Sequence, residues 1–291
     1  MYKEDYKQQS DFYKQAIARK NELTSFLREK NFSDLDGRPN VTIYTGMASF
    51  TSPNTVKVVL PDEEIELQGK EIFINTGATS IIPAIDGVKE SKHVYTSTNL
   101  LDLDILPRHL IIVGGGYIGL EFASMYAEFG SKVTILEGGS AFIPREDRDI
   151  ADSVRKVLEK KGIEIRLNAH AQSIHDTADG VTLTYTNTAD DIPCFVEGDA
   201  ILLATGRKPM IEGLNLQAAG IKVDAHGAII TDVHLYTTTP HIWAMGDVKG
   251  GPQFTYVSLD DFRIIRNKLF GDKERTTEDR DPIAYSVFID P

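Results

Sequence analysis

A glycine-rich turn within residues 109–137 constrains the fold of this chain more than any other feature. Leu110–Val113 is a short apolar run that leads into Gly114, Gly116 and Gly119 in GxGxxG spacing. The following residues repeat apolar and small side chains with a helical period. The order of strand, tight turn and helix is typical of a parallel α/β fold that binds a dinucleotide.

Each glycine of the turn is expected to be required for a different reason. Gly114 permits the turn, Gly116 lets a pyrophosphate approach the backbone, and Gly119 lets the helix pack closely on the strand. Glu137 stands at the end of the next predicted strand, where a carboxylate accepts hydrogen bonds from ribose hydroxyls and repels a 2′-phosphate. The sequence therefore predicts a preference for NAD(H) over NADP(H).

Composition narrows the remaining possibilities. The chain has 291 residues, of which 41% are hydrophobic and 25% charged, enough for two compact units. Its net charge of −12 opposes binding to nucleic acid or to an anionic membrane, and we expect a cytoplasmic protein because no apolar signal core or membrane-length run occurs. Cys194 is the single cysteine, and the seven histidines show no ligand spacing, so neither a disulfide within the chain nor a metal site is predicted.

The rest of the chain predicts an alternation of helices, strands and β-meanders. Residues 2–30 are predicted to form one amphipathic helix, and residues 79–109 are interpreted as a connection between units. The order β-α-β-α-β predicts a parallel sheet covered on both faces. The other predicted elements are meanders at 41–78 and 169–198, helices at Asp149–Lys161 and Tyr256–Leu269, and strands at Glu71–Asn75, Val133–Leu136, Ile163–Leu167, Asp199–Thr205, Ala228–Thr231, His241–Met245 and 284–291.

Four motifs in sequence order resemble those of one enzyme family. They are INTGA at 74–78, GGGYIGLEFA at 114–123, ATGRKP at 204–209 and WAMGDV at 243–248. Together they resemble the pyridine nucleotide–disulfide oxidoreductases, two-dinucleotide flavoproteins that include dihydrolipoamide dehydrogenase and mercuric reductase. The segments 142–152, 250–266 and 285–291 look closest to the reactive-chlorine-resistance branch of that family.

The resemblance implies an α/β fold in which a Rossmann-like NAD(P)-binding domain is inserted into a partial FAD-binding domain. The implied divisions are residues 1–101 and 230–281 for the FAD-binding domain, 102–229 for the NAD(P)-binding domain, and 282–291 for the start of a dimer-interface domain.

The resemblance also implies the site residues. Those for the pyridine nucleotide are Gly114, Gly115, Gly116, Tyr117, Ile118 and Gly119, with Glu137 on the ribose and Gly206 beside the nicotinamide; those for FAD are Thr76, Gly77, Ala78, Gly246 and Asp247. Tyr117 matches an aromatic gate over the nicotinamide pocket, and Glu121 matches a carboxylate that pairs with a lysine beside the flavin; these two are the implied catalytic residues.

Several of these residues have simpler interpretations. Tyr117 and Glu121 can be ordinary helix positions, and Asp247 can cap the helix that follows it. Arg145 and Arg148 can lie near a 2′-phosphate, but we favour surface charge for them because Glu137 is present.

The sequence also departs from the family pattern. A complete member opens with its own GxGxxG turn for FAD and a CxxxxC pair, neither of which occurs before Val41, and it continues into a domain with a His–Glu pair. We therefore expect a central fragment that binds FAD poorly and is catalytically incomplete.

Two functions remain open at this stage. In the intact homodimeric enzyme, a hydride would pass from NADH to FAD and on to a disulfide, metal ion or oxidant, and the sequence does not identify this small-molecule or metal-ion acceptor. The alternative is a non-catalytic NAD-binding module.

Overall fold

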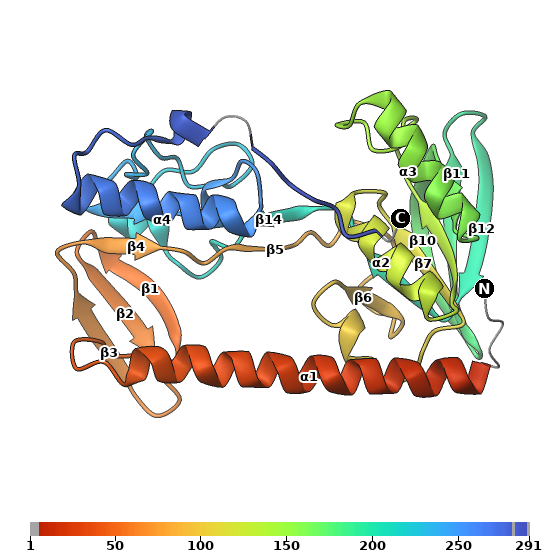
Figure 1. Cartoon of the computed structure of the whole chain (residues 1–291), viewed down its shortest axis with the longest axis horizontal. Helices are drawn as coiled ribbons and strands as arrows, with labels where there is room; N and C mark the ends of the chain where they lie inside the picture. Colours follow the sequence, from red (N-terminus) through yellow and green to blue (C-terminus); the bar gives the residue numbers. More distant parts are fainter. Residues whose placement is uncertain (1–5, 281–282, 290–291) are drawn as a thin grey trace. The chain divides into compact units, whose positions relative to one another are not determined.

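The chain forms two compact units in the computed structural model, which describes residues 6–280 and 283–289 (Figure 1). Unit 1 contains residues 1–31, 80–206 and 287–291, and unit 2 contains residues 32–79 and 207–286. The borders at 79/80 and 206/207 differ from the predicted 101/102 and 229/230. Assigning a cofactor to each domain remains a prediction.

Unit 1 is built on a five-stranded sheet in the order β6-β13-β7-β8-β9. Every neighbouring pair in it is parallel, as predicted for an α/β fold. The strands are β6 (Val94–Thr96), β7 (His109–Val113), β8 (Lys132–Leu136), β9 (Glu164–Arg166) and β13 (Ala200–Leu203).

Different layers cover the two faces of this sheet. Leu110 and Ile112 of β7 face helices α1 (Tyr6–Asp36), α2 (Tyr117–Glu128) and α3 (Arg148–Lys160), whereas Ile111 and Val113 pack with an antiparallel sheet. That second layer consists of β10 (Ala169–Thr177), β11 (Gly180–Asn187) and β12 (Ile192–Gly198). The prediction of a parallel sheet covered on both faces is confirmed, with the meander as the second layer.

Helix α1 extends six residues beyond its predicted end, to Asp36, and the predicted residues 2–5 lie outside the described part of the chain. Its first turns pack on unit 1: Tyr13 is fully buried, and its hydroxyl lies 3.1 Å from that of Tyr126 in α2. The Tyr6 hydroxyl donates to Leu106 O at 2.7 Å. Tyr6, Tyr13 and Ile17 therefore belong to the same core as the parallel sheet. The other large apolar side chains predicted for the helix stripe within the described residues are exposed: Phe12, Leu23, Phe26 and Leu27.

The interpretation of residues 79–109 as a connection is wrong. β6 forms an edge of the parallel sheet, and the 3₁₀ turn η1 (Leu100–Asp102) follows it. Leu100 and Leu106 are 0% and 1% exposed, so they are core residues of unit 1. A three-residue strand within polar sequence carries too little periodicity to be recognised.

Unit 2 combines an antiparallel sheet with a pair of parallel strands. β1 (Met47–Ser52), β2 (Thr55–Val59) and β3 (Glu64–Gln68) form the sheet, and β4 (Ile72–Ile74) pairs in parallel with β15 (Ile242–Ala244). The remaining elements are α4 (Thr255–Phe270) and the 3₁₀ turns η2 (Leu216–Ala219), η3 (Gly246–Lys249) and η4 (Thr277–Arg280). A small two-stranded sheet joins β5 (Ala78–Ser80) to β14 (Arg207–Pro209).

Two predicted strands are not formed. The 228–231 segment makes only isolated bridges, Val223 with Ile229 and Thr231 with Thr237. Residues 283–289 contain no strand, and the predicted positions 290–291 lie outside the described residues. An extended segment without a hydrogen-bonded neighbour cannot become part of a sheet.

Candidate functional site

The glycine turn lies between β7 and α2, at the carboxyl end of the parallel sheet. Gly114 has φ +109, and a Cβ there would lie 2.4 Å from Ala204 O; a Cβ on Gly119 would lie 2.3 Å from Gly114 O. Both positions therefore require glycine for packing. By contrast, a Cβ on Gly116 would meet nothing within 4 Å, so this glycine borders open space.

The carboxylate of Glu137 is held against the turn by two backbone N–H groups. Gly115 N donates to Oε2 and Gly139 N donates to Oε1, each at 2.7 Å. The Glu137 backbone is tied to the next strand, because Glu137 N donates to Arg166 O at 2.8 Å. Each carboxylate oxygen retains a further lone pair, so the fixed side chain can still accept hydroxyl donors.

Gly206 lies near the glycine turn on the side of β7 opposite β8. Ala204 N donates to Val113 O at 2.8 Å, and Gly206 O accepts from Ile81 N at 3.0 Å. Gly206 is exposed and has φ +114, a conformation that favours glycine. The structure thus brings Gly114–Gly119, Glu137 and Gly206 to one edge of one sheet.

Tyr117, Ile118 and Glu121 occupy the first turns of α2 and are all partly buried. The Tyr117 hydroxyl donates to the Glu146 carboxylate, and Glu121 Oε1 accepts from Phe288 N at 3.0 Å. Gly116 is the N-cap residue, so the N–H groups of the first turn point away from the helix and have no acceptor within it.

The two arginines differ in their surroundings. Both are exposed, as expected for surface charge, but Arg148 also donates to three carbonyl oxygens: those of Phe142 at 3.0 Å, Ile143 at 2.7 Å and Glu146 at 2.7 Å. Arg148 therefore has a structural role in its own loop, which neither interpretation of its charge anticipated.

The predicted FAD residues lie together in unit 2, where the parallel strands β4 and β15 end. Met245 N donates to Ile74 O at 3.0 Å, which places the Thr76 segment beside Gly246 and Asp247. Thr76 Oγ1 donates to Met210 O at 2.7 Å, and Gly77 O accepts from Met210 N at 2.9 Å. Ala78 O accepts from Arg207. Asp247 lies inside η3, and Phe254 is the N-cap residue of α4, so Asp247 does not cap that helix.

A buried ionic cluster, which the sequence interpretation missed, supports the Gly246–Asp247 turn. Asp261 is fully buried; it accepts from Gly246 N at 2.7 Å and from Arg280 Nη2 at 2.6 Å, and Lys249 Nζ lies 3.6 Å away. Burial lowers the pKa of Lys249, although the nearby Asp261 carboxylate opposes this change. Asp261 shares the buried face of α4 with Val257, Ile264 and Ile265, so a carboxylate at an apolar helix position was the available signal.

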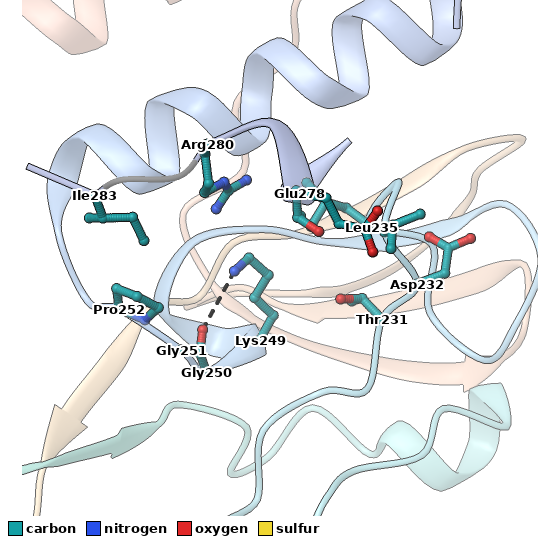
Figure 2. A pocket seen from close by; sticks show the side chains of 12 residues that line it. Thr231, Asp232, Leu235, Lys249, Gly250, Gly251, Pro252, Glu278, Arg280 and Ile283 are labelled. Carbon is teal, nitrogen blue, oxygen red and sulfur yellow. Dashed lines mark hydrogen bonds between the residues drawn. The ribbon is translucent and has the colours of Figure 1, made fainter. Parts of the chain in front are cut away.

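Next to this cluster is a cavity of about 480 Å³ within unit 2. Figure 2 shows Lys249, Gly250 and Gly251 on one side of it and Arg280 and Ile283 on the other. None of the predicted FAD residues lines this cavity.

The described ranges 6–280 and 283–289 contain no cluster of three or more histidine, cysteine, aspartate or glutamate side chains that could hold a metal ion. No helix there is long and apolar enough to cross a membrane.

Comparison with known proteins adds to this geometry. The family model described as pyridine nucleotide-disulphide oxidoreductase matches residues 2–261. The probable pyridine nucleotide-disulfide oxidoreductase RclA of Escherichia coli (strain K12) is 49% identical over 289 residues, which cover 99% of this chain and 64% of that protein. The dihydrolipoyl dehydrogenase of Geobacillus stearothermophilus is 34% identical over 251 residues, covering 86% and 52% respectively.

A solved structure agrees with this similarity. The HOCl-induced flavoprotein disulfide reductase RclA from Escherichia coli matches with a TM-score of 0.89 and 46% sequence identity, over 98% of this chain and 65% of that one. The chain thus spans between about half and two thirds of the length of these relatives.

Proposed function

The chain belongs to the pyridine nucleotide–disulphide oxidoreductase family, and from this premise we propose that its glycine turn binds NADH in preference to NADPH. We further propose that the protein, with FAD bound, passes a hydride from NADH to the flavin and on to a disulfide, metal ion or oxidant. The acceptor is proposed only as a chemical class, because the sequence does not identify it.

The fixed carboxylate of Glu137 is the observation that carries the nucleotide proposal. Two backbone N–H bonds of 2.7 Å hold both of its oxygens beside the glycine turn. A carboxylate fixed in this way can accept two vicinal ribose hydroxyls without losing side-chain entropy on binding. A 2′-phosphate at the same place would bring a second negative charge against it, which disfavours NADPH.

The glycine turn also fits a pyrophosphate. Gly116 borders open space, and the first turn of α2 presents N–H groups without acceptors in the helix. An anion there also gains from the helix dipole, by about 0.3–1 kcal/mol at an exposed site.

The arrangement in unit 2 supports a flavin site in preference to the non-catalytic alternative. Thr76 and Asp247 follow neighbouring parallel strands, and Asp261 holds Gly246 N, so the Asp247 turn is supported from the core. The Gly246–Asp247 turn has no function in a module that binds NAD alone. FAD, when bound, supplies an acceptor for two electrons.

Two titrations test the proposal. Calorimetry should show that the unmodified chain binds NADH more tightly than NADPH, and equal affinities would contradict the nucleotide assignment. A titration of flavin fluorescence should show weak, saturable FAD binding that Asp247→Ala abolishes. NADH binding without any Asp247-dependent flavin binding would favour the non-catalytic module.

A further inference from the structure

His170 lies beside the end of β8, although it belongs to strand β10 of the meander. A Cβ placed on Gly138 would lie 3.5 Å from His170 Nδ1 and, apart from its own chain neighbours, would meet no other atom within 4 Å. The imidazole nitrogen therefore faces the open side of Gly138, the residue directly after Glu137. His170 itself is exposed, so a ligand can reach it.

Backbone hydrogen bonds fix the start of β10 against this segment. Ala169 N donates to Glu137 O at 2.9 Å. Asn168 N donates to Gly139 O at 3.0 Å, so the chain is bonded on both sides of Gly138. Gly139 N also holds the Glu137 carboxylate, at 2.7 Å. The backbone that carries the imidazole and the carboxylate is thus held in one arrangement.

The charges near the imidazole come from a small number of groups. In the β10–β11 ladder, His170 is opposite Thr186, which carries no charge. Arg166, in β9, donates to the Tyr185 hydroxyl at 2.9 Å. Tyr185 belongs to the buried face of the meander, and it alternates with Thr186, so Arg166 is bonded on the face opposite that of His170. The titratable group that the 137–139 segment brings to His170 is Glu137.

The sheet order indicates which part of a nucleotide reaches this place. Gly116 follows β7, Glu137 follows the neighbouring β8, and His170 follows β9, which is next in the sheet. A pyrophosphate at Gly116 and a ribose at Glu137 leave the 2′-position of the adenosine on the β9 side. The 2′-phosphate of NADPH would therefore meet the Glu137 carboxylate and the His170 imidazole together.

We propose that His170 determines how strongly NADPH is rejected, because its charged imidazole attracts the 2′-phosphate that the Glu137 carboxylate repels. The inference rests on the proposed nucleotide site and adds a specificity-determining residue to it. Histidine changes its charge between about pH 5 and pH 8, so the preference for NADH should be smaller at the lower end of this range. NADH has no 2′-phosphate, and its affinity should not depend on His170.

Calorimetry with NADH and NADPH at about pH 6 and about pH 8 measures the ratio of the two affinities. The 2′-phosphate itself takes up a proton near about pH 6, so each variant is compared with the unmodified chain at the same pH. At about pH 6, His170→Gln should prefer NADH about 3- to 10-fold more strongly than the unmodified chain does, the scale of one charge pair partly exposed to water. At about pH 8 the two proteins should have nearly the same preference.

Two further variants separate charge from shape. His170→Lys is charged at both pH values and should show a smaller preference for NADH than the unmodified chain already at about pH 8. His175→Gln, at another exposed position of β10, is the control and should keep the preference of the unmodified chain at both pH values.

A second measurement follows the imidazole itself by nuclear magnetic resonance. The imidazole C–H resonance that disappears in His170→Gln belongs to position 170. At constant pH, adenosine 2′,5′-bisphosphate should shift this resonance toward the position of the charged ring, because a neighbouring phosphate favours the charged form. Adenosine 5′-monophosphate, which lacks the 2′-phosphate, should not shift it in that direction.

The role of His170 is overturned if His170→Gln and the unmodified chain have the same preference at about pH 6, or if the affinities for NADH and NADPH change together in that variant. It is also overturned if His170→Lys rejects NADPH as strongly as the unmodified chain, or if both adenosine phosphates shift the resonance equally. Failure of NADH to bind the unmodified chain would instead contradict the proposed nucleotide site, and the role of His170 would then fall with it.

Discussion

Gly115 N donates to Glu137 Oε2 at 2.7 Å, so the backbone of the glycine turn itself orients the carboxylate at the end of the neighbouring strand. The turn and the acid are thus one structural unit, although 22 residues separate them. A substitution in the turn is therefore expected to alter the position of the Glu137 carboxylate, and a substitution of Glu137 to alter the turn.

Glu137→Ala should narrow the difference in binding free energy between NADH and NADPH by about 1–2 kcal/mol, because it removes a charge-assisted acceptor and a repulsive charge together. Calorimetric titration with both nucleotides measures this change. Glu90→Ala, at an exposed position of the same unit, is the control and should keep the original difference. An unchanged difference in Glu137→Ala would remove Glu137 from the ribose site.

Gly116→Ala and Gly119→Ala should differ in how much stability they lose and in how much they weaken NADH binding. A Cβ on Gly116 meets nothing, so the free energy of unfolding should fall by about 1 kcal/mol or less, while NADH affinity falls about tenfold or more because the methyl group occupies the pyrophosphate approach. A Cβ on Gly119 meets Gly114 O at 2.3 Å and should cost about 1–3 kcal/mol of stability. Urea unfolding of the two variants, with NADH titrations, distinguishes them; similar losses of stability would contradict the geometry.

The stability of unit 1 should fall as the pH is lowered through 6.5. Burial, together with Lys132, lowers the pKa of His109 below its ordinary value of 6.5. At pH values between the lowered pKa of His109 in the folded state and 6.5 in the unfolded state, the unfolded state binds more protons than the folded state. The free energy of unfolding therefore rises with pH across that window. His109→Gln should reduce this slope, by at most about 1.4 kcal/mol per pH unit. Thermal unfolding followed by circular dichroism at several pH values checks this, with the exposed His175→Gln as control; an identical slope in His109→Gln and the unmodified chain would contradict it.

Glu71→Ala should destabilise unit 2 by about 1–3 kcal/mol, because it leaves the buried indole N–H of Trp243 without its acceptor, Glu71 Oε2, at 2.8 Å. Trp243 is the single tryptophan, so its fluorescence during urea unfolding reports on this unit. Glu71→Gln keeps an acceptor oxygen and should lose less stability than Glu71→Ala. Equal stability in all three proteins would show that the bond contributes nothing.

Cys194→Ser should change the free energy of unfolding by less than about 1 kcal/mol and leave any NADH oxidation unchanged. Cys194 is a partly buried residue of β12, opposite Tyr185 in the meander. One sulfur cannot alternate between dithiol and disulfide within a single chain. The assay is NADH oxidation with added FAD and a small disulfide. Turnover above the free-flavin background that disappears in Cys194→Ser would make this thiol a redox centre.

The sequence predicted the elements that depend on interactions between neighbouring residues, and it missed those that depend on pairing between distant segments. The strand, turn and helix around Gly114–Gly119 are determined locally, and the structure has them where the pattern indicates. β6 was missed because three residues gain their conformation from pairing with β13, which lies far along the chain. The extended end segment was predicted as a strand from its composition, but no partner strand lies beside residues 283–289 in the described structure.

The candidate site divides in the same way. Glu137 was identified because spacing and strand position are visible in the sequence, and its assignment to the ribose stays a prediction. Glu146 and Asp261 were not identified, because each acts through a partner that only the fold brings near: the Tyr117 hydroxyl and Gly246 N. A charged residue in a loop, such as Glu146, gives no sign of its partner. The position of Asp261 on the apolar face of α4 signals burial but does not identify Gly246 N as its partner.

The contact between Tyr13 and Tyr126 has a consequence for synthesis of the protein on the ribosome. The two residues are 113 positions apart, so the apolar side of α1 emerges long before α2 can cover it. At about 5–20 residues per second, the interval is on the order of ten seconds. For that time the side of α1 that carries Tyr13 lacks α2, the helix against which it packs in the folded unit.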